Sequence, residues 1–493
     1  MRAMPSSGSP ARARSASAAE PPPGRPNLIL AIIVCCQLMI VVATTVTGIA
    51  LPGIKRDLGF SPTGLSWVVN AYMLAFGGLL LLGGRAGDIL GRRRVFLAGI
   101  ALFTAGSLLA ALAPSAPVLL AALAVEGVGA ALADPTSLAL LTATFAQGAP
   151  RNRALAVSAM VAGVGTAVGL LLGGLLAAAS WRWAMGLNVP CGAAVLAATP
   201  FFVPESERRP ARFDLAGALT STAGMAAVVN AFIRAQAHGW SDRYSIGSLA
   251  AAAVLLTAFV AIEARAVQPI VPLHLFARAQ RRYGFADIFL VGATVSGLFF
   301  FPTQFLETAR GFSTLRTGAA YLPLAVAMVA TAWAAPRLLA RVSARPLLVA
   351  GALTLGAGTL WFTDLSADTA YLAGVVGPLV LVGVGLGLTI MPLTALILAD
   401  TPSEEVGAAS GLQQAMLRIG GSLGLAVMVT TGASSGAATK AHPVAALLHS
   451  VTTAFTIASV VVGAVLVLGF AAFHRASADA RATPARTAPV APD

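Results

Sequence analysis

Residues 84–94 read GRAGDILGRRR and lie between two apolar runs, at 64–83 and 95–113. Each run is close to the ~20 residues that cross a ~30 Å hydrocarbon core as a helix. The stretch between them contains a single acid, Asp88, and four arginines. Two hydrophobic helices joined by a short cationic connection are typical of a chain that turns back at a membrane surface, so this segment predicts a membrane protein.

The same alternation of apolar run and short connection extends along the chain. Its 493 residues are 57% hydrophobic and 10% charged, with a mean hydropathy of +0.83, whereas a soluble domain is about 25% charged. The sequence lacks the short alternating segments of a membrane barrel, so helices are the expected spanning element. We predict an all-α polytopic membrane protein with fourteen spans, at 27–51, 64–83, 95–113, 117–143, 154–178, 184–203, 214–234, 246–263, 283–304, 317–336, 346–363, 369–397, 407–432 and 447–472.

The basic residues follow this predicted topology. The formal charge is +13, and most arginines lie in the two terminal tails, at residue 265 and in connections on one side of the membrane, at 85–94, 151–153, 208–212, 278–282 and 337–345. Because cytoplasmic loops collect Lys and Arg, we expect both termini in the cytoplasm. The basicity then reflects topology, and we expect no nucleic-acid partner. The opposite side has few cations: Lys55, Arg56, Arg182, Arg243, Arg310, Arg316 and Lys440.

The sequence contains no catalytic or cofactor-binding pattern. Neither lysine follows a phosphate-binding glycine loop, no H-E-x-x-H motif occurs, and the five histidines are scattered. The cysteines Cys35, Cys36 and Cys191 lie in apolar runs and are interpreted as small hydrophobic residues. We expect a protein that is not an enzyme, binds no cofactor or metal, and draws its energy from an ion gradient.

An internal repeat divides the chain. The segment at 84–99 recurs in degenerate form at 337–351, and GTAVGL at 165–170 recurs as GGSLGL at 420–425. The two offsets, about 252 and 255 residues, agree closely, which indicates two homologous halves related by an axis along the membrane normal. We predict six-helix bundles at 27–203 and 283–473, two linker helices within 204–282, and disordered cytoplasmic tails at 1–26 and 474–493.

Several motifs resemble those of the major facilitator superfamily, and in particular of its fourteen-span drug:proton antiporter branch. The family pattern G-x-L-A-D-R-x-G-R-R is matched by Gly84, Asp88, Gly91, Arg92 and Arg93. Other family-like segments are WVVNAY at 67–72, WRW at 181–183, NVP at 188–190, RTG at 316–318, LPL at 322–324 and GAASG at 407–411.

The resemblance implies a major facilitator fold of two six-helix bundles plus two inserted linker helices. It further implies secondary active export of small amphipathic compounds, as in drug and antibiotic efflux, by alternating access with proton antiport. The expected partners are a small-molecule substrate, protons and the lipid bilayer, and the expected form is a monomer in the bacterial cytoplasmic (inner) membrane. Alternatives are a facilitator or metabolite exporter without proton coupling, and a non-transporting membrane sensor.

The motif at 84–94 has a physical interpretation. Gly84 and Gly91 permit a tight reversal and close helix approach. Asp88 can pair with arginines or a helix N-terminus of a neighbouring bundle, in a contact that makes and breaks as the bundles rock. Arg92 and Arg93 can reach anionic headgroups. The alternative is that this segment only anchors the topology.

The fifth predicted span carries a stripe of glycines. Gly165, Gly169 and Gly173 recur every fourth residue and would give a smooth face for close packing, and Gly174 belongs to the same glycine-rich helix. In the family this stretch is associated with antiporters and includes a proline, which is Leu170 here, so the kink that proline promotes is not expected.

Two charged positions of the family pattern are altered. The first-span acid of L-D-x-T-I-V-N-V-A-L-P falls on Ala43, and the fourth-span arginine of R-x-x-Q-G-x-G-A falls on Leu123. The glutamine of the second pattern is Glu126. Because one acid and one arginine of the family pattern are both absent, these two changes together leave the net charge within the membrane unchanged. This is the result expected if an intramembrane ion pair had been exchanged as a unit.

Three acids lie within apolar spans: Glu126, Asp134 and Asp287. An ionised carboxylate in hydrocarbon costs several kcal/mol unless it is paired or hydrated, so these are the proton-coupling candidates. Glu126 lies near mid-span, whereas Asp287 is close enough to Arg281 and Arg282 to be simply paired. For each acid the alternative is a satisfied structural hydrogen bond. Arg234 and Arg418 are interpreted as packing or interface charges.

Overall fold

The computed structural model describes residues 25–61, 64–145, 149–205, 214–266, 269, 271, 273–366, 368–398, 406–436 and 443–482. Some side chains within these ranges, that of Asp88 among them, lie outside the described part, as do the predicted tails before residue 25 and after residue 482. The secondary-structure elements of the described residues are all helical, which confirms the all-α prediction.

The first half of the chain contains α1 (Arg25–Leu58), α2 (Ser66–Leu90), α3 (Arg92–Ala111), α4 (Ala116–Thr144), α5 (Ala149–Ala179), α6 (Trp181–Gly186) and α7 (Asn188–Phe202). Two helices follow, α8 (Leu215–His238) and α9 (Arg243–Arg265). The remainder forms η1 (Leu273–Phe276), α10 (Ala279–Gln304), the π-helical turn η2 (Phe305–Ala309), α11 (Thr314–Ala320), α12 (Leu322–Arg341), α13 (Ala344–Trp361), η3 (Phe362–Asp364), η4 (Leu372–Val376), α14 (Gly377–Leu398), α15 (Val406–Gly436) and α16 (Pro443–Ala482).

The helices match the predicted membrane spans. Among the described residues, thirteen helical segments are long and apolar enough to cross a bilayer. The remaining predicted span is α5, whose second half, Val168–Ala179, is itself apolar. About fourteen spans are thus confirmed. Several helices continue beyond the predicted spans, among them α1 past residue 51 to Leu58, α2 past residue 83 to Leu90 and α16 past residue 472 to Ala482.

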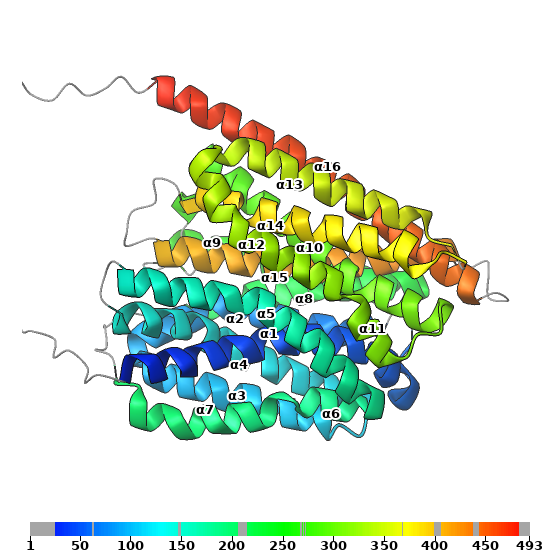
Figure 1. The fold of residues 1–493 in the computed structure, drawn as a ribbon, viewed down its shortest axis with the longest axis horizontal. Helices are drawn as coiled ribbons and strands as arrows, with labels where there is room; N and C mark the ends of the chain where they lie inside the picture. The colour runs from blue at the N-terminus through cyan, green and yellow to red at the C-terminus, as the bar shows by residue number, and fades with distance from the viewer. Residues whose placement is uncertain are drawn as a thin grey trace, which may run out of the picture.

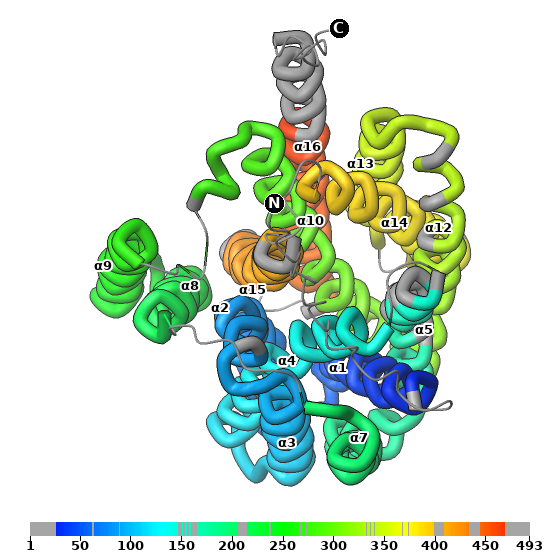
Figure 2. Tube along the Cα trace, turned by 90° about the vertical axis from the view of Figure 1, so that its left-hand side faces the viewer, coloured from blue at the N-terminus to red at the C-terminus, as the bar shows by residue number. Residues whose placement is uncertain are grey.

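The long helices run side by side and fall into two groups (Figure 1). In the first group α4 packs on α1, α2 and α3, and α7 packs on α1 and α3. In the second group α10 packs on α14, α15 and α16, and α13 packs on α14 and α16. Figure 2, viewed along the helices, shows the two groups on opposite sides of the molecule. We call them the N-terminal bundle (α1–α7) and the C-terminal bundle (α10–α16).

The bundles meet along two seams. On one side α2 packs along α15, and on the other side α5 packs against α11 and α12. The α8–α9 pair lies outside the bundles, where α8 touches both α2 and α15 and α9 packs on α8 (Figure 2). The linker helices therefore border the α2–α15 seam and do not cover the seam between α5 and α11–α12.

The motif at 84–94 is almost entirely helical, which corrects the expectation of a loop. α2 includes Gly84 and the backbone of Asp88, and α3 starts at Arg92. Only Gly91 separates the helices, and it has a φ of +104°, a conformation that a residue with a Cβ rarely adopts. The chain can reverse at one residue because that residue is glycine.

Candidate functional site

Polar side chains from both bundles gather in the membrane interior near the α2–α15 seam. Tyr72 comes from α2, Glu126 and Asp134 from α4, and Arg418 from α15. Glu126, Asp134 and Arg418 lie within electrostatic range of Tyr72, and Arg418 lies within the same range of Asp134. We call these four residues the central polar cluster. It brings together two of the three acids singled out in the sequence.

Glu126 is held in the cluster by close helix packing. A Cβ placed on Gly127 would lie 2.5 Å from the carbonyl oxygen of Tyr72, and one on Gly106 would lie 2.6 Å from the backbone nitrogen of Glu126. Glycines at these points let α4 approach α2 and α3 closely. The Glu126 side chain is only 4% exposed, and it forms no hydrogen bond or ion pair with another described residue. It is a buried acid without a fixed partner, which is suited to binding a proton.

Arg418 is the cationic member of the cluster and comes from the opposite bundle. Its guanidinium carbon lies 4.8 Å from the centre of the Phe76 ring, and its Cβ faces Gly77, where an added Cβ would lie 2.8 Å away. The buried Nε has no hydrogen-bond partner among the described residues. Arg418 thus lies at the interface between the bundles, and its charge acts on Asp134 of the N-terminal bundle.

Two further polar contacts cross the same seam. Ser422 on α15 donates a hydrogen bond of 2.6 Å to the side-chain oxygen of Asn70 on α2. Ser296 on α10 lies 3.6 Å from the Met73 sulfur. Asn70 and Tyr72 belong to the WVVNAY segment, to which the sequence alone assigned no role. Their signal was two polar groups two residues apart in an apolar span, which point to nearly opposite sides of the helix, and the spacing does not reveal which helices they meet.

Asp287 lies apart from the central polar cluster, within α10. It is fully buried, and both carboxylate oxygens lack a hydrogen-bond partner among the described residues. The pairing with Arg281 or Arg282 considered from the sequence does not form; the Arg282 guanidinium lies 5.7 Å from the Tyr283 ring centre. Asp287 therefore stays a candidate for proton binding, in the other bundle from Glu126.

The glycines of the 84–94 motif bring α2 against α4 just below the cluster. An added Cβ on Gly84 would lie 3.5 Å from Pro135 Cβ, and one on Gly87 would lie 2.7 Å from Thr136 Cγ2. These neighbours follow Asp134 in the sequence, so the motif is packed directly against the helix that carries both acids. A side chain at either glycine would meet α4.

The arginines of the motif contact protein groups. Arg92 donates a hydrogen bond of 3.2 Å to the carbonyl of Ala139 on α4, and Arg94 lies 3.4 Å from the Glu205 carboxylate. Arg85 donates a hydrogen bond of 2.7 Å to the carbonyl of Pro269. Arg93 is half-buried. The expected pairing of Asp88 falls outside the description, because its side chain is not among those described.

The glycine stripe of α5 packs on two helices. Added Cβ atoms on Gly165, Gly169 and Gly173 would collide with Val41, Thr45 and Val46 of α1. Gly174 points instead to α11, where its added Cβ would lie 3.3 Å from the Cα of Gly318. The stripe therefore joins α5 to its own bundle and, at Gly174, to the other bundle across the second seam.

Arg234 has a local structural role at the end of α8. It forms an ion pair of 2.9 Å with Asp242, the cap of α9, and stacks on Tyr244 at 4.4 Å. Desolvation raises the pKa of Asp242, but the Arg234 hydrogen bond and charge and the backbone N–H groups of Ser245 and Tyr244 together lower it below its usual value. The pair links the end of α8 to the start of α9.

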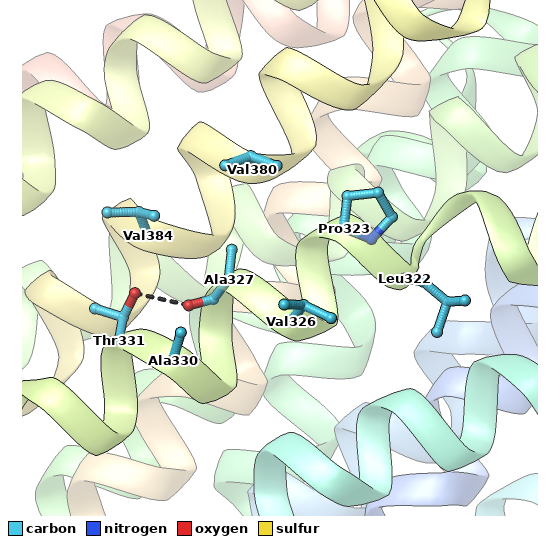
Figure 3. Close-up of a pocket in the computed structure, with 8 residues that line it drawn as sticks. All are labelled: Leu322, Pro323, Val326, Ala327, Ala330, Thr331, Val380 and Val384. Carbon is cyan, nitrogen blue, oxygen red and sulfur yellow. Dashed lines mark hydrogen bonds between the residues drawn. The ribbon is translucent and has the colours of Figure 1, made fainter.

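Two cavities lie away from the central polar cluster. An open groove between α12 and α14 has a volume of about 470 Å³. Figure 3 shows its lining side chains, which are almost all apolar. Its one hydroxyl, on Thr331, is already bound to the carbonyl of Ala327. Val326 in this groove is 65% exposed, so the groove faces the lipid. A second cavity, about 540 Å³, lies between the end of α1 and η2 and includes Arg56 and Glu307.

Comparison with known proteins identifies similar chains. A sequence profile of the Major Facilitator Superfamily matches residues 33–425. The cephamycin export protein CmcT of Amycolatopsis lactamdurans is 39% identical over 85% of this chain and 87% of its own length. The puromycin resistance protein pur8 of Streptomyces alboniger is 37% identical over 90% of this chain and 88% of its own.

The fold also matches solved transporter structures. The crystal structure of an auto-inhibited POT family peptide transporter superposes with a TM-score of 0.65, covering 95% of this chain and 99% of that one, at 15% sequence identity. At this identity the match concerns the fold alone. It agrees with the two groups of helices that meet along the seams.

Proposed function

The chain belongs to the major facilitator superfamily, and we propose that it is a drug exporter that expels small amphipathic compounds in exchange for protons. The observation that carries the proposal is the central polar cluster. It places a buried acid without a fixed partner, Glu126, in the same cluster as a cation of the opposite bundle, Arg418. An acid at such a place can couple its protonation to the relative position of the bundles.

The coupling follows from the cost of charge in hydrocarbon. A deprotonated Glu126 needs a nearby cation or water, and a protonated Glu126 needs neither. If rocking of the bundles changes the distance between Glu126 and Arg418, the acid holds its proton in one state and releases it in the other. Proton uptake on the outside and release on the inside then drive the cycle.

The available energy is sufficient for useful export. At a membrane potential of ~150 mV one proton supplies about 3.5 kcal/mol, or roughly a few-hundred-fold gradient of a neutral substrate. The absence of the family's first-span acid, at Ala43, and of its fourth-span arginine, at Leu123, supports an exchange of roles in which Glu126 replaces the acid.

The substrate class is proposed from the relatives. Their names describe export of or resistance to cephamycin, puromycin and tetracenomycin C, so we propose antibiotics of comparable amphipathic character. The site of action is the bacterial cytoplasmic (inner) membrane, and both termini are cytoplasmic because the arginine-rich ends of the spans lie on that side. The working unit is a monomer.

The test is transport in proteoliposomes that contain the purified chain. A proton gradient of either sign is imposed, and the movement of puromycin and of a lipophilic dye is followed. We expect uphill transport that reverses with the sign of the gradient and stops with a protonophore. Transport that is independent of the proton gradient but still runs down a substrate gradient would establish the rival function, that of a facilitator. The absence of the family's first-span acid, at Ala43, is the observation that favours this rival.

A further inference from the structure

Two of the three cysteines meet in the folded chain. Cys35 lies on α1 and Cys191 on α7, 156 residues apart in the sequence, and their sulfur atoms are 2.7 Å from each other. The bond length of a disulfide is ~2.05 Å, so this distance is only a little longer than the covalent one. In this structure both thiols are free. The sequence indicated no such pair, because the two residues have no spacing pattern.

The positions of the cysteines follow from how each helix packs. On α1 the buried stripe includes Ile29, Ile33, Cys36 and Ile40, and Cys35 lies at its edge. On α7 the buried stripe is Asn188, Gly192, Val195 and Thr199, and Cys191 lies at its edge. The two edges meet where α1 and α7 pack together, so both sulfurs are half-buried and border the lipid.

The contact between these helices is fixed at a second point. The Trp181 indole N–H, on α6 beside α7, donates a hydrogen bond of 2.7 Å to the Asp57 carboxylate near the end of α1. An added Cβ on Gly53 of α1 would lie 3.4 Å from Trp181 Cβ. α1 therefore packs on α6 and α7 over much of its length, and all three belong to the N-terminal bundle. Motion between the bundles leaves the thiol pair together.

We propose that Cys35 and Cys191 are an oxidation site at which a lipid-dissolved quinone joins α1 to α7 by a disulfide. In this reaction two S–H bonds break and one S–S bond forms. The two protons and two electrons pass to the quinone, which becomes a quinol. Hydrocarbon disfavours the thiolate that reacts, but the fixed proximity of the sulfurs offsets this by making the step intramolecular.

A metal ion explains the pair less well. Soft metals accept two thiolates, but no group of three or more His, Cys, Asp or Glu side chains that could hold a metal occurs among the described residues. The third cysteine, Cys36, is fully buried on the neighbouring face of α1. Cys36 is a natural internal control, because no contact between its sulfur and another cysteine is seen among the described residues, and it should therefore stay a thiol.

The consequence of the disulfide is local. It closes a loop between residues 35 and 191 and so stabilises the N-terminal bundle, chiefly by restricting the unfolded chain. We expect the apparent melting temperature of the oxidised protein to rise by about 5 °C or more. Because the bond lies within one bundle, transport should stay within about twofold of the reduced protein.

The experiment uses the full chain with Cys36→Ala in lipid nanodiscs, treated with duroquinone, which has no open ring position to alkylate thiols. After denaturation, free thiols are counted by the mobility shift of a polyethylene-glycol maleimide. We expect two labelled thiols before oxidation, none after it, and two again after dithiothreitol. Mass spectrometry of the wild-type chain should find one linked peptide pair, containing Cys35 and Cys191.

The matched controls carry Cys36→Ala with either Cys35→Ala or Cys191→Ala. Each should show one labelled thiol throughout. Two thiols that persist after duroquinone in the Cys36→Ala chain would overturn the proposal. So would loss of the single thiol in either control, which would indicate bonds between chains or oxidation of isolated thiols, or a peptide that joins Cys36 to Cys191.

Discussion

Replacing Glu126 by glutamine should separate binding from energy coupling. Glutamine keeps the shape of the side chain and one hydrogen-bonding end, but it cannot titrate. Glu126 is 4% exposed and forms no hydrogen bond with another described residue, so Glu126→Gln leaves no described partner group unsatisfied. We expect a change in folding free energy of at most about 1 kcal/mol and normal amounts of protein in the membrane.

The loss of function should be much larger than the loss of stability. A proton that crosses ~150 mV supplies about 3.5 kcal/mol, which supports roughly a few-hundred-fold accumulation. If Glu126 is the residue that binds this proton, the whole of that accumulation depends on it. The accumulation ratio in Glu126→Gln should therefore fall to about one, whereas exchange down a substrate gradient should continue.

The assay is uptake into inverted proteoliposomes under an imposed proton gradient, with substrate binding measured in parallel by tryptophan fluorescence. Glu126→Asp, which titrates but is shorter by one methylene, should retain part of the accumulation. Glu205→Gln is the matched control, because Glu205 is paired with Arg94 and its side chain is 32% exposed. The same chemical change there should leave accumulation unchanged.

One result would refute the reasoning outright. If Glu126→Gln accumulates substrate uphill with the pH dependence of the wild type, then the acid is structural and the central polar cluster does not carry the proton. Asp134→Asn and Asp287→Asn would then be examined in the same assay. A loss of accumulation in one of them would assign the proton to that residue, and no loss in either would remove the case for proton antiport.

Three further predictions follow. Asp88→Asn should reach normal membrane levels but transport at least tenfold more slowly, because the contact that it is expected to make is needed only during the cycle; wild-type rates would reduce the motif to an anchor. In a cysteine-free background, single cysteines in the 145–153 and 204–213 connections should be labelled only from the cytoplasm, and those in 433–446 only from outside. Labelling of 204–213 and 433–446 from the same side of the membrane would contradict fourteen spans. Gly169→Val should destabilise the protein by about 1–3 kcal/mol, because its side chain would collide with Thr45 and Val42, as measured by thermal unfolding. Gly463→Val, where nothing lies within 4 Å of an added Cβ, is its control, and equal losses in the two variants would contradict the packing argument.

The proposed exchange of roles between Ala43 and Glu126 would change which helices respond to the proton. An acid on α4 lies on the same helix as Asp134 and is packed, through Gly127, against Tyr72 on α2. The helix α2 also carries the 84–94 motif and forms the seam with α15. Protonation of Glu126 would therefore act on the seam through directly packed helices rather than through the first span.

The number of spans, their approximate positions and the two-fold internal repeat were predictable from the sequence. Each can be recognised from consecutive residues of the chain alone. About twenty apolar residues in a row suffice to cross the bilayer, and their backbone must be helical there. The glycines at 84 and 165–174 were likewise recognised as close-packing positions, since a missing side chain has the same meaning in any helix. The identity of their partners, Pro135 on α4 and Val41, Thr45 and Val46 on α1, was not predictable.

The site depended on tertiary structure for the same reason. In a membrane both faces of a helix are apolar, so hydrophobic periodicity does not show which face meets a neighbour. Glu126 and Arg418 were visible as charges in apolar spans, but 292 positions separate them, and only the packing of α2 on α4 and α15 brings both to Tyr72. The packing of α1 on α7 brings Cys35 to Cys191, and the Asp287 carboxylate in α10 forms no hydrogen bond with Arg281 or Arg282. The sequence determined that the chain crosses the membrane and how often, because burial in lipid is a property of each helix alone. Which charges meet inside was decided by the tertiary structure, because that depends on the shapes of helices distant in sequence.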